Sequence, residues 1–188
     1  MKVEVVEIHG DEDFIKKISG ISHGSEGASV EKLLNWGHLS PLEFAGVTFK
    51  VTCPIFVARQ MMRHRTGKYM EASLRYCESG LEFYTPPELE DDLMYKFMIE
   101  NSKFVYSTLL EKYGKGRGNE LARCVLPVST VTEFYMQMDM RNLTHFLLLR
   151  LADGAQIETR LLASDMLDLI EEKFPAITAY IIKEVFHV

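Results

Sequence analysis

The clearest structural signal is the stretch VTFKVTCPIFVARQ (47–60), in which apolar and polar side chains alternate until a proline ends the pattern. Successive side chains of an extended chain point to opposite sides, so the valines and the phenylalanine face one way and the threonines and the lysine the other. This alternation predicts a strand over residues 47–53. Pro54 suits the first turn of a helix, and we expect that helix to run from Ile55 to about Arg65.

The same two periods extend the prediction to the rest of the chain. Alternation predicts further strands at residues 2–8, 81–84 and about 130–138. Apolar residues at helical spacing predict helices over residues 30–36, about 94–113, 141–151, 156–173 and 176–186. Helices combined with a sheet predict an α+β (mixed α/β) fold, and the length of 188 residues predicts a single domain over residues 1–188.

Composition argues against several classes of protein. The chain carries 21 Lys and Arg against 27 Asp and Glu, and this net charge of −6 argues against a general nucleic-acid-binding protein. No apolar run approaches the ~18 residues that a membrane span needs. The strand-like start does not resemble an export signal. We therefore expect a cytoplasmic protein without a membrane or nucleic-acid partner.

Three cysteines, Cys53, Cys77 and Cys124, lie far apart and form no metal-binding spacing. An odd number of distant cysteines also gives no disulfide framework, so we expect free, mostly buried thiols. The six histidines never form a His-x-x-x-His pair. No metal site is therefore expected.

One segment is basic in this acidic chain: residues 59–75 carry four arginines, a lysine and His64 against a single acid, Glu71. On the expected helix, Arg59 and Arg63 would share one face. Clustered arginines favour a phosphate-bearing ligand, because the planar guanidinium matches phosphate oxygens. A solvated helix face, or pairing with acids elsewhere in the chain, would explain the same segment, and composition alone leaves these interpretations open.

Three further arginines bear on the choice between these interpretations. Arg123 lies in LARCVLPV (121–128), Arg141 begins a helix with His145 one turn on, and Arg150 interrupts HFLLLRLA (145–152). An unpaired guanidinium is costly in apolar surroundings. Internal ion pairs would satisfy these arginines, and a polyanionic ligand is the alternative that their number favours.

Ordered motifs along the chain resemble those of the flavin-dependent thymidylate synthases. Arg63-His64-Arg65, followed after seven residues by Ser73, matches the signature of that family. The likeness continues in the blocks GHLSPLEF (37–44), CPIFVARQ (53–60), EFYTP (82–86), ARCVLP (122–127), MRNLTHFLLLR (140–150) and AQIE (155–158). The resemblance covers most of the chain beyond residue 35, and it implies that family's fold, a central, largely antiparallel sheet flanked by helices.

The resemblance also implies an activity. Enzymes of this family make dTMP from dUMP, with methylenetetrahydrofolate as carbon donor, NADPH as reductant and bound FAD as redox relay. Their active sites lie between the subunits of a homotetramer. By this likeness we expect an FAD-dependent thymidylate synthase, which needs no protein nucleophile and therefore no catalytic role for its cysteines or for Ser73.

Individual residues receive roles from the same resemblance. Arg150 is the expected catalytic residue, because a fixed positive charge against the pyrimidine ring would stabilise negative charge that develops there. The residues implied in cofactor binding are His38, Ser40, Arg63, His64, Arg65, Glu71, Asp139, Arg141 and His145. Those implied in substrate binding are Gln60, Arg63, Glu71, Ser73, Arg75, Arg123 and Arg150.

The chain departs from the family pattern at Phe44, Asp139, Gly154 and Ile157. These departures bear on the folate contact and on the identity of the pyrimidine nucleotide. Two alternatives follow: methylation of another pyrimidine nucleotide, such as UMP, and a flavin- or nucleotide-binding protein without turnover. The retention of Arg150, Glu71 and Gln60 argues against the second, because phosphate binding alone needs none of them.

Overall fold

The computed structural model describes residues 1–22, 24–76 and 81–187. Among these, the first of two compact units comprises Met1–Val51, Gln60–Met70 and residues 135–187, and the second comprises Thr52–Arg59 and Glu71–Phe134. The single domain expected over residues 1–188 stays a prediction.

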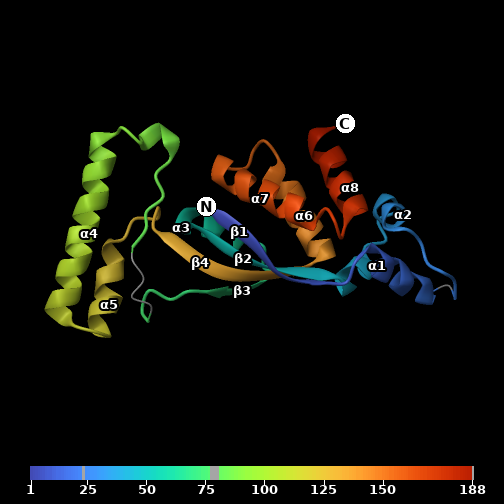
Figure 1. The fold of residues 1–188 in the computed structure, drawn as a ribbon, viewed down its shortest axis with the longest axis horizontal. Coiled ribbons are helices and arrows are strands. Elements are labelled where there is room, and N and C mark those ends of the chain that lie inside the picture. Colours follow the sequence, from blue (N-terminus) through green and yellow to red (C-terminus); the bar gives the residue numbers. More distant parts are fainter. Residues whose placement is uncertain (23, 77–80, 188) are drawn as a thin grey trace. The chain divides into compact units, whose positions relative to one another are not determined.

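A four-stranded antiparallel sheet in the order β1-β2-β4-β3 is the central element (Figure 1). Its strands are β1 (Lys2–His9), β2 (Gly46–Pro54), β3 (Lys68–Glu71) and β4 (Val131–Asp139). Alternation in the sequence correctly predicts β1, β2 and β4, and the α+β fold with a largely antiparallel sheet is confirmed. The edge strand β3 has only four residues and no apolar alternation, so the sequence does not predict it.

One face of the sheet in the first unit is apolar. Val47, Phe49 and Val51 of β2 are buried together with Met136 and Met138 of β4. The helices α6 (Met140–Leu151) and α7 (Ile157–Ile170) lie over this face (Figure 1). Complete burial of an apolar side chain of this size stabilises a fold by about 1.5–3 kcal/mol, and this layer therefore holds the first unit together.

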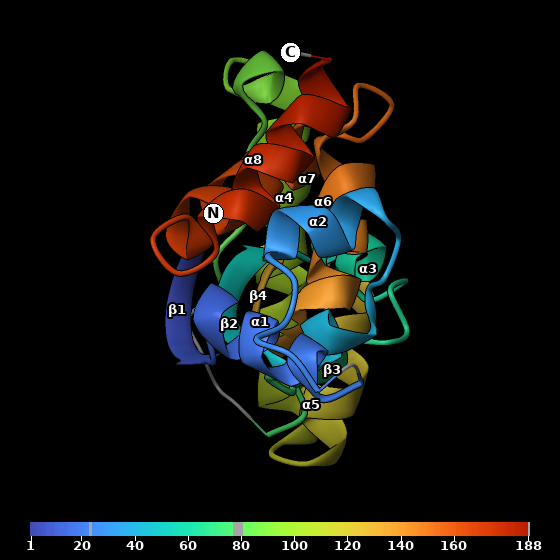
Figure 2. The same cartoon turned by 90° about the vertical axis from the view of Figure 1, so that its right-hand side faces the viewer.

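Three more helices complete the first unit: α1 (Glu12–Ser19), α2 (Val30–Asn35) and α8 (Pro175–Phe186). α8 packs against α2 and α6 (Figure 2). The helices predicted over residues 30–36, 141–151, 156–173 and 176–186 are confirmed. α1 is an addition to the prediction, and its start is fixed by Asp11, whose side chain accepts a hydrogen bond of 2.8 Å from the backbone N–H of Phe14.

The second unit contains α4 (Leu93–Tyr113) packed against the shorter α5 (Arg117–Ala122). The long helix expected near residues 94–113 is confirmed. The strand expected at residues 81–84 is wrong: Phe83 forms only an isolated antiparallel bridge with Thr130. Prolines follow at positions 86 and 87, and because proline has no backbone N–H, the ladder cannot continue.

Helix α3 (Ile55–Met61) ends four residues earlier than expected. The backbone N–H of His64 donates to Met61 O at 3.1 Å, and that of Gly67 donates to His64 O at 3.1 Å, so the chain leaves the helix through two tight turns. The Tyr69 hydroxyl lies 2.9 Å from Met61 O and 3.0 Å from His64 O and shares its proton between them. Arg63 therefore stands in a turn, and the expectation that it shares a helix face with Arg59 is wrong.

The cysteines only partly match expectation. Cys53 is buried, and burial raises the pKa of its thiol to about 12. Cys124 is exposed, contrary to the prediction, because it lies in a short 3₁₀ turn at the surface. Cys77 lies outside the described residues.

The described residues include neither a candidate membrane span nor a candidate metal cluster. No helix there is long and apolar enough to cross a membrane. No group of three His, Cys, Asp or Glu side chains in that part of the chain is arranged to hold a metal ion.

Candidate active site

Arg150 is held in the first unit by two neutral acceptors. From the last turn of α6, its Nε donates to Nε2 of His64 at 3.0 Å, and its Nη2 donates to the backbone oxygen of Gln60 at 3.3 Å. Within residues 1–22, 24–76 and 81–187 no carboxylate lies in salt-bridge range of Arg150. The internal ion pair considered from the sequence is therefore not formed there, and the half-buried guanidinium keeps its full charge.

His64 is packed so that its imidazole stays neutral. Burial and the nearby charges of Arg150 and His145 lower its pKa from 6.5 to about 4. The ring meets Phe146 edge-on at 4.8 Å between centroids and lies 6.2 Å from the ring of His145. Arg150, His64 and His145, predicted from different motifs, therefore come together in one cluster.

Gln60 is anchored from α7. Its side-chain nitrogen donates to the side-chain oxygen of Gln156, and its side-chain oxygen accepts a hydrogen bond of 3.2 Å from the hydroxyl of Thr159. Sequence reasoning assigned Gln60 but not these two partners. Gln156 falls in a family-like block, whereas Thr159 carries no signal, since only the fold shows what its hydroxyl contacts.

A cavity of about 720 Å³, here called the helical cavity, opens beside α2, α6 and α8. Leu42 and Leu148 give it apolar walls, while Arg141, Asn142 and His145 supply donors. Leucines suit a flat ring system, and a guanidinium suits phosphate oxygens. Its walls and donors suit the ring system of a flavin, whereas the carboxylates of Glu43 and Asp139, which also line it, leave no excess of positive charge for the phosphates. Arg141 is exposed and forms an ion pair with Glu43, so for Arg141 the structure shows the internal ion pair that the sequence left open.

His38 and Ser40 line a different cavity, of about 600 Å³, called here the serine cavity. It lies between α1, α2 and the loop that joins them, and His38 meets Trp36 edge-on at 5.9 Å. The intervening residue Leu39 faces the helical cavity. The GHLSP segment therefore separates the two cavities, and the structure does not bring His38 and Ser40 into the same cavity as Arg141 and His145.

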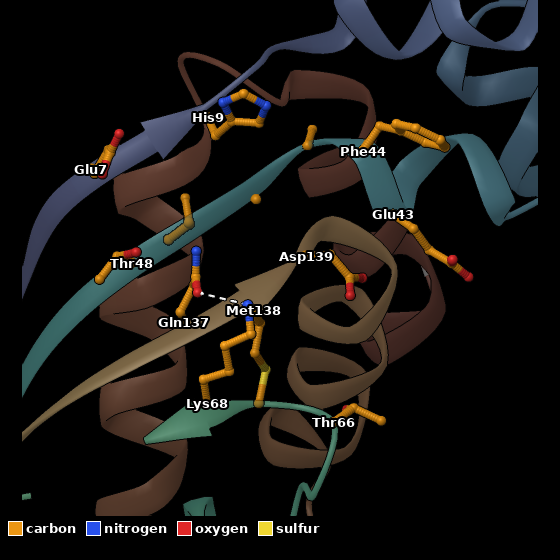
Figure 3. Close-up of a pocket in the computed structure, with 13 residues that line it drawn as sticks. Glu7, His9, Glu43, Phe44, Thr48, Thr66, Lys68, Gln137, Met138 and Asp139 are labelled. Atoms are coloured by element: carbon orange, nitrogen blue, oxygen red, sulfur yellow. Dashed lines mark hydrogen bonds between the residues drawn. The ribbon is translucent and has the colours of Figure 1, made fainter. Parts of the chain in front are cut away.

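A third cavity, about 360 Å³ and called here the sheet cavity, lies against the strands (Figure 3). Three carboxylates, those of Glu7, Glu43 and Asp139, line it, and its single lysine, Lys68, donates to the Gln137 side chain at 3.2 Å. This excess of negative charge disfavours an anionic group there. Glu43 and Asp139 also line the helical cavity, so the two cavities share one wall.

Asp139 serves as the N-cap of α6. Its carboxylate accepts hydrogen bonds from the backbone N–H of Asn142 at 2.9 Å and from the side-chain amide of Asn142 at 2.6 Å. The positive end of the helix dipole favours an acid at this place. The departure at Asp139 thus has a structural explanation. At the other departures, Phe44 and Ile157 are exposed, and Gly154 has open space where a side chain would stand.

The second unit contains the other four predicted site residues, Glu71, Ser73, Arg75 and Arg123. Glu71 accepts a hydrogen bond of 2.8 Å from the Thr132 hydroxyl, and Ser73 Oγ accepts one of 3.3 Å from the Arg75 backbone N–H. Arg75 pairs with Glu120 at 2.8 Å.

Arg123 and the two arginines of the Arg-His-Arg motif are exposed. The apolar setting expected for Arg123 is wrong, because its short 3₁₀ turn directs the side chain to the surface. Arg63 and Arg65, in the first unit, are also exposed. Within the part of the chain that the structure describes, none of the three side chains forms an ion pair, so their charges are available to a ligand.

Comparison with known proteins agrees with these features. A family model described as thymidylate synthase complementing protein matches residues 5–176. The flavin-dependent thymidylate synthase of Thermosipho africanus is 36% identical, with 92% of this chain and 87% of that protein covered. A flavin-dependent thymidylate synthase of Thermus thermophilus is 35% identical, with 92% of this chain and 72% of that protein covered.

A solved structure also resembles the whole chain. It is that of PolB, a UMP/dUMP methylase from Streptomyces cacaoi bound with 5-Br UMP, and it superposes with a TM-score of 0.86. The two chains are 28% identical, and the superposition covers 98% of this chain and 94% of that one. Together with the family model and the relatives, this shows that the chain belongs to the family of flavin-dependent thymidylate synthases.

Proposed function

We propose that this protein converts dUMP to dTMP, with methylenetetrahydrofolate as the carbon donor, NADPH as the reductant and bound FAD. The observation that carries the proposal is the setting of Arg150: a half-buried guanidinium held by two neutral acceptors, in a chain of this family. A carboxylate partner would cancel its charge. Two neutral acceptors leave that charge free to stabilise an electron-rich ring.

In the proposed reaction, carbon five of the pyrimidine becomes nucleophilic while negative charge spreads over the ring. Arg150 stabilises that charge by lying against the ring, and the fixed position of its guanidinium means that little reorganisation is needed. Gln60 is the proposed neighbour of the same ring, because its amide is already oriented by Thr159 and Gln156. Ser73, Arg75 and Arg123 are the proposed ligands of the nucleotide phosphate, and Glu71 is proposed to contact both the nucleotide and the flavin.

FAD, when bound, supplies the redox chemistry that the side chains of this protein do not have. Arg141 and His145, in the helical cavity, and Asp139 in its wall are proposed to hold it there. Arg63, His64 and Arg65 are proposed to face it from the turn after α3. His38 and Ser40 are proposed to lie near the flavin from the side of the serine cavity.

A homotetramer with shared active sites is the proposed assembly. An exposed face of α4 supports it: Met94, Phe97, Met98 and Phe104 are exposed at helical spacing. Ile99, Ser102 and Tyr106, on another face of α4, are buried. A second copy of the chain would cover the exposed apolar face. A cytoplasmic location is proposed with this function, because dUMP and NADPH are cytoplasmic metabolites.

The proposal is tested by the visible absorption spectrum of the purified protein. Flavin bands that change on titration with dUMP, followed by dTMP formation with methylenetetrahydrofolate and NADPH, are the expected results. A colourless protein that FAD cannot reconstitute would contradict the proposal. A yellow protein that binds dUMP and forms no dTMP would favour the binding protein without turnover.

Methylation of UMP is a second candidate, and the likeness to a UMP/dUMP methylase favours it. The two substrates differ only in the 2′-hydroxyl of the ribose. Dissociation constants and kcat/KM for dUMP and UMP, measured side by side on the flavin-loaded protein, decide between them. A preference for UMP would replace dUMP in the proposal and leave the roles of the arginines unchanged.

A further inference from the structure

We infer that His64 is a positioning residue for Arg150, whose guanidinium it orients through an acceptor that carries no charge. The importance of this contact for catalysis rests on the proposed function, because that function makes Arg150 catalytic. The contact itself stands on the geometry of the first unit.

Arg150 is held at two points along one edge. Its Nε is bound by His64 at 3.0 Å and its Nη2 by Gln60 O at 3.3 Å. Two acceptors on a planar, rigid group fix its plane as well as its position. Among the described residues no partner is found for Nη1. The guanidinium therefore presents its other end to a ligand.

The choice of a histidine has a physical reason. A carboxylate at this place would hold the arginine more strongly, but it would neutralise the charge that a developing anion needs. An imidazole accepts the same hydrogen bond through a lone pair and adds no negative charge. His64 thus fixes Arg150 without weakening the field that Arg150 creates.

The contact also fixes the tautomer of His64. Because Nε2 accepts a hydrogen bond, the ring proton must lie on Nδ1, and an imidazolium would set two N–H groups against each other. The ionisable groups that face His64 are Arg150 and His145 of α6 and the Tyr69 hydroxyl of β3, with Arg63 and Arg65 beside it in the chain. None of them carries a negative charge at neutral pH, since burial raises the pKa of Tyr69 to about 12. Nothing in this set favours the imidazolium form.

Packing restrains the His64 ring in the position from which it accepts the hydrogen bond of Arg150. Phe146, which is fully buried, meets the imidazole edge-on at 4.8 Å with an interplanar angle of 71°. The backbone oxygen of His64 lies 3.0 Å from the Tyr69 hydroxyl. Side chain and backbone are thus both restrained, so the acceptor is in place before a ligand arrives.

Nitrogen NMR of protein labelled with ¹⁵N-histidine tests the contact without any assay. The His64 signals are identified by their loss in His64→Gln. We expect a neutral ring protonated at Nδ1 that does not titrate between pH 8 and pH 5. A His64 signal that titrates near 6.5, or a ring protonated at Nε2, would overturn the inference. The result is independent of whether the protein makes dTMP, so failure of the proposed function remains distinguishable.

Two variants of His64 distinguish the effect of its hydrogen-bond acceptor from the effect of its aromatic ring. His64→Gln places an oxygen near the position of Nε2 and removes the ring, whereas His64→Phe keeps a ring against Phe146 and removes the acceptor. Per bound flavin, we expect His64→Phe to lower kcat about tenfold or more, the effect of one hydrogen bond to a charged group, and His64→Gln to recover most of it. Equal losses of kcat in both variants would show that catalysis depends on the ring and not on the acceptor, and would overturn the inference.

A double-mutant cycle with Arg150→Ala completes the test. If His64 acts through Arg150, adding His64→Phe to Arg150→Ala should change kcat by less than about twofold, because the contact is already gone. If the fold-losses of kcat in the two single variants instead multiply in the double variant, His64 acts independently of Arg150, and the positioning role is wrong.

Discussion

The hydroxyl of Thr159 donates a hydrogen bond of 3.2 Å to the side-chain oxygen of Gln60, which orients the amide of a residue predicted to bind the nucleotide. Thr159 is only 1% exposed, so water cannot easily replace it as a donor. The side-chain nitrogen of Gln60 donates at the same time to the side-chain oxygen of Gln156. The first turn of α7 thus determines which atoms of Gln60 remain for a ligand.

Thr159→Val should weaken nucleotide binding. The substitution keeps the shape of the side chain and removes the donor, so the Gln60 amide loses one of its two restraints. We expect the KM for the nucleotide to rise severalfold and the free energy of unfolding to fall by about 1 kcal/mol. Steady-state kinetics and urea unfolding measure the two effects.

Thr178→Val is the matched control. Thr178 is also a buried threonine, but its Oγ1 has no hydrogen-bond partner among the described residues. Removing an unsatisfied hydroxyl should leave stability unchanged or raise it by about 1 kcal/mol, with no effect on KM. Equal losses of stability and affinity in both variants would mean that the Thr159 contact has no special role.

Arg150→Ala should lower turnover strongly while the flavin stays bound. Removing one preorganised group that stabilises developing charge typically lowers kcat by about 10²–10³-fold. The helical cavity does not include Arg150, so flavin content should remain near the wild-type level. The ratio of flavin absorbance to protein absorbance checks the flavin content, and kcat measured on the same sample checks the loss of turnover. A variant that turns over at the wild-type rate would remove Arg150 from the catalytic role.

Replacement of both Arg63 and Arg65 by Ala should lower the bound FAD severalfold. Both side chains are exposed, so their loss should leave the core intact, and each removes a charge available to phosphate. The control is Arg160→Ala, because Arg160 already pairs with Asp153 at 3.2 Å. Full flavin occupancy in the double variant, or an equal loss in Arg160→Ala, would contradict the assignment.

Much of the fold could be predicted because one side of each long strand is buried. Phe49 and Val51 in β2 and Met136 in β4 are buried and alternate with polar residues. This period of two is visible in the sequence and therefore predicts the strands. No periodic pattern in the sequence marks the end of α3. There the hydroxyl of Tyr69, eight residues after Met61, donates to the backbone oxygen of the last helical residue, and a contact between side chain and backbone has no period.

The candidate site was predictable in its residues but not in their partners. The motifs include Arg150, His64 and Gln60, but spacing alone does not show that the first donates to the other two. The exposure of one predicted arginine also differs from expectation. Arg123 lies in an apolar stretch, and its side chain still reaches the surface, because a long side chain can leave an apolar segment while its backbone remains there.

Charged substitutions on the exposed face of α4 should break the proposed tetramer. Phe97 and Phe104 are 66% and 68% exposed, so Phe97→Glu and Phe104→Glu cost little in the isolated chain. In an interface between copies, each would bury an unpaired charge. Sedimentation velocity should show smaller species for both variants. The control is Glu111→Lys on the same helix. A wild-type monomer with full activity would contradict the shared sites.

Glu12 should make stability depend on pH through α8. Its Oε1 accepts hydrogen bonds from the backbone N–H groups of Ala176 at 2.7 Å and Ile177 at 3.2 Å, so it caps the first turn of that helix. Glu12→Ala should therefore cost about 1 kcal/mol in urea unfolding, the usual value of a helix cap. Glu12→Gln keeps an acceptor and should cost less.

The sign of the pH effect follows from burial, which raises the pKa of Glu12 above its usual 4.5. Between 4.5 and the raised pKa, the folded chain binds more protons at this site than the unfolded chain does. The pH-dependent part of the Glu12 contribution to the free energy of unfolding is therefore fully present below pH 4.5 and is lost as the pH rises through the raised pKa. In urea unfolding across this range, the free energy of unfolding of the wild type relative to Glu12→Gln should fall as the pH rises, and Glu172→Gln, an exposed control, should follow the wild type. Parallel curves for wild type and Glu12→Gln would show that Glu12 titrates alike in both states.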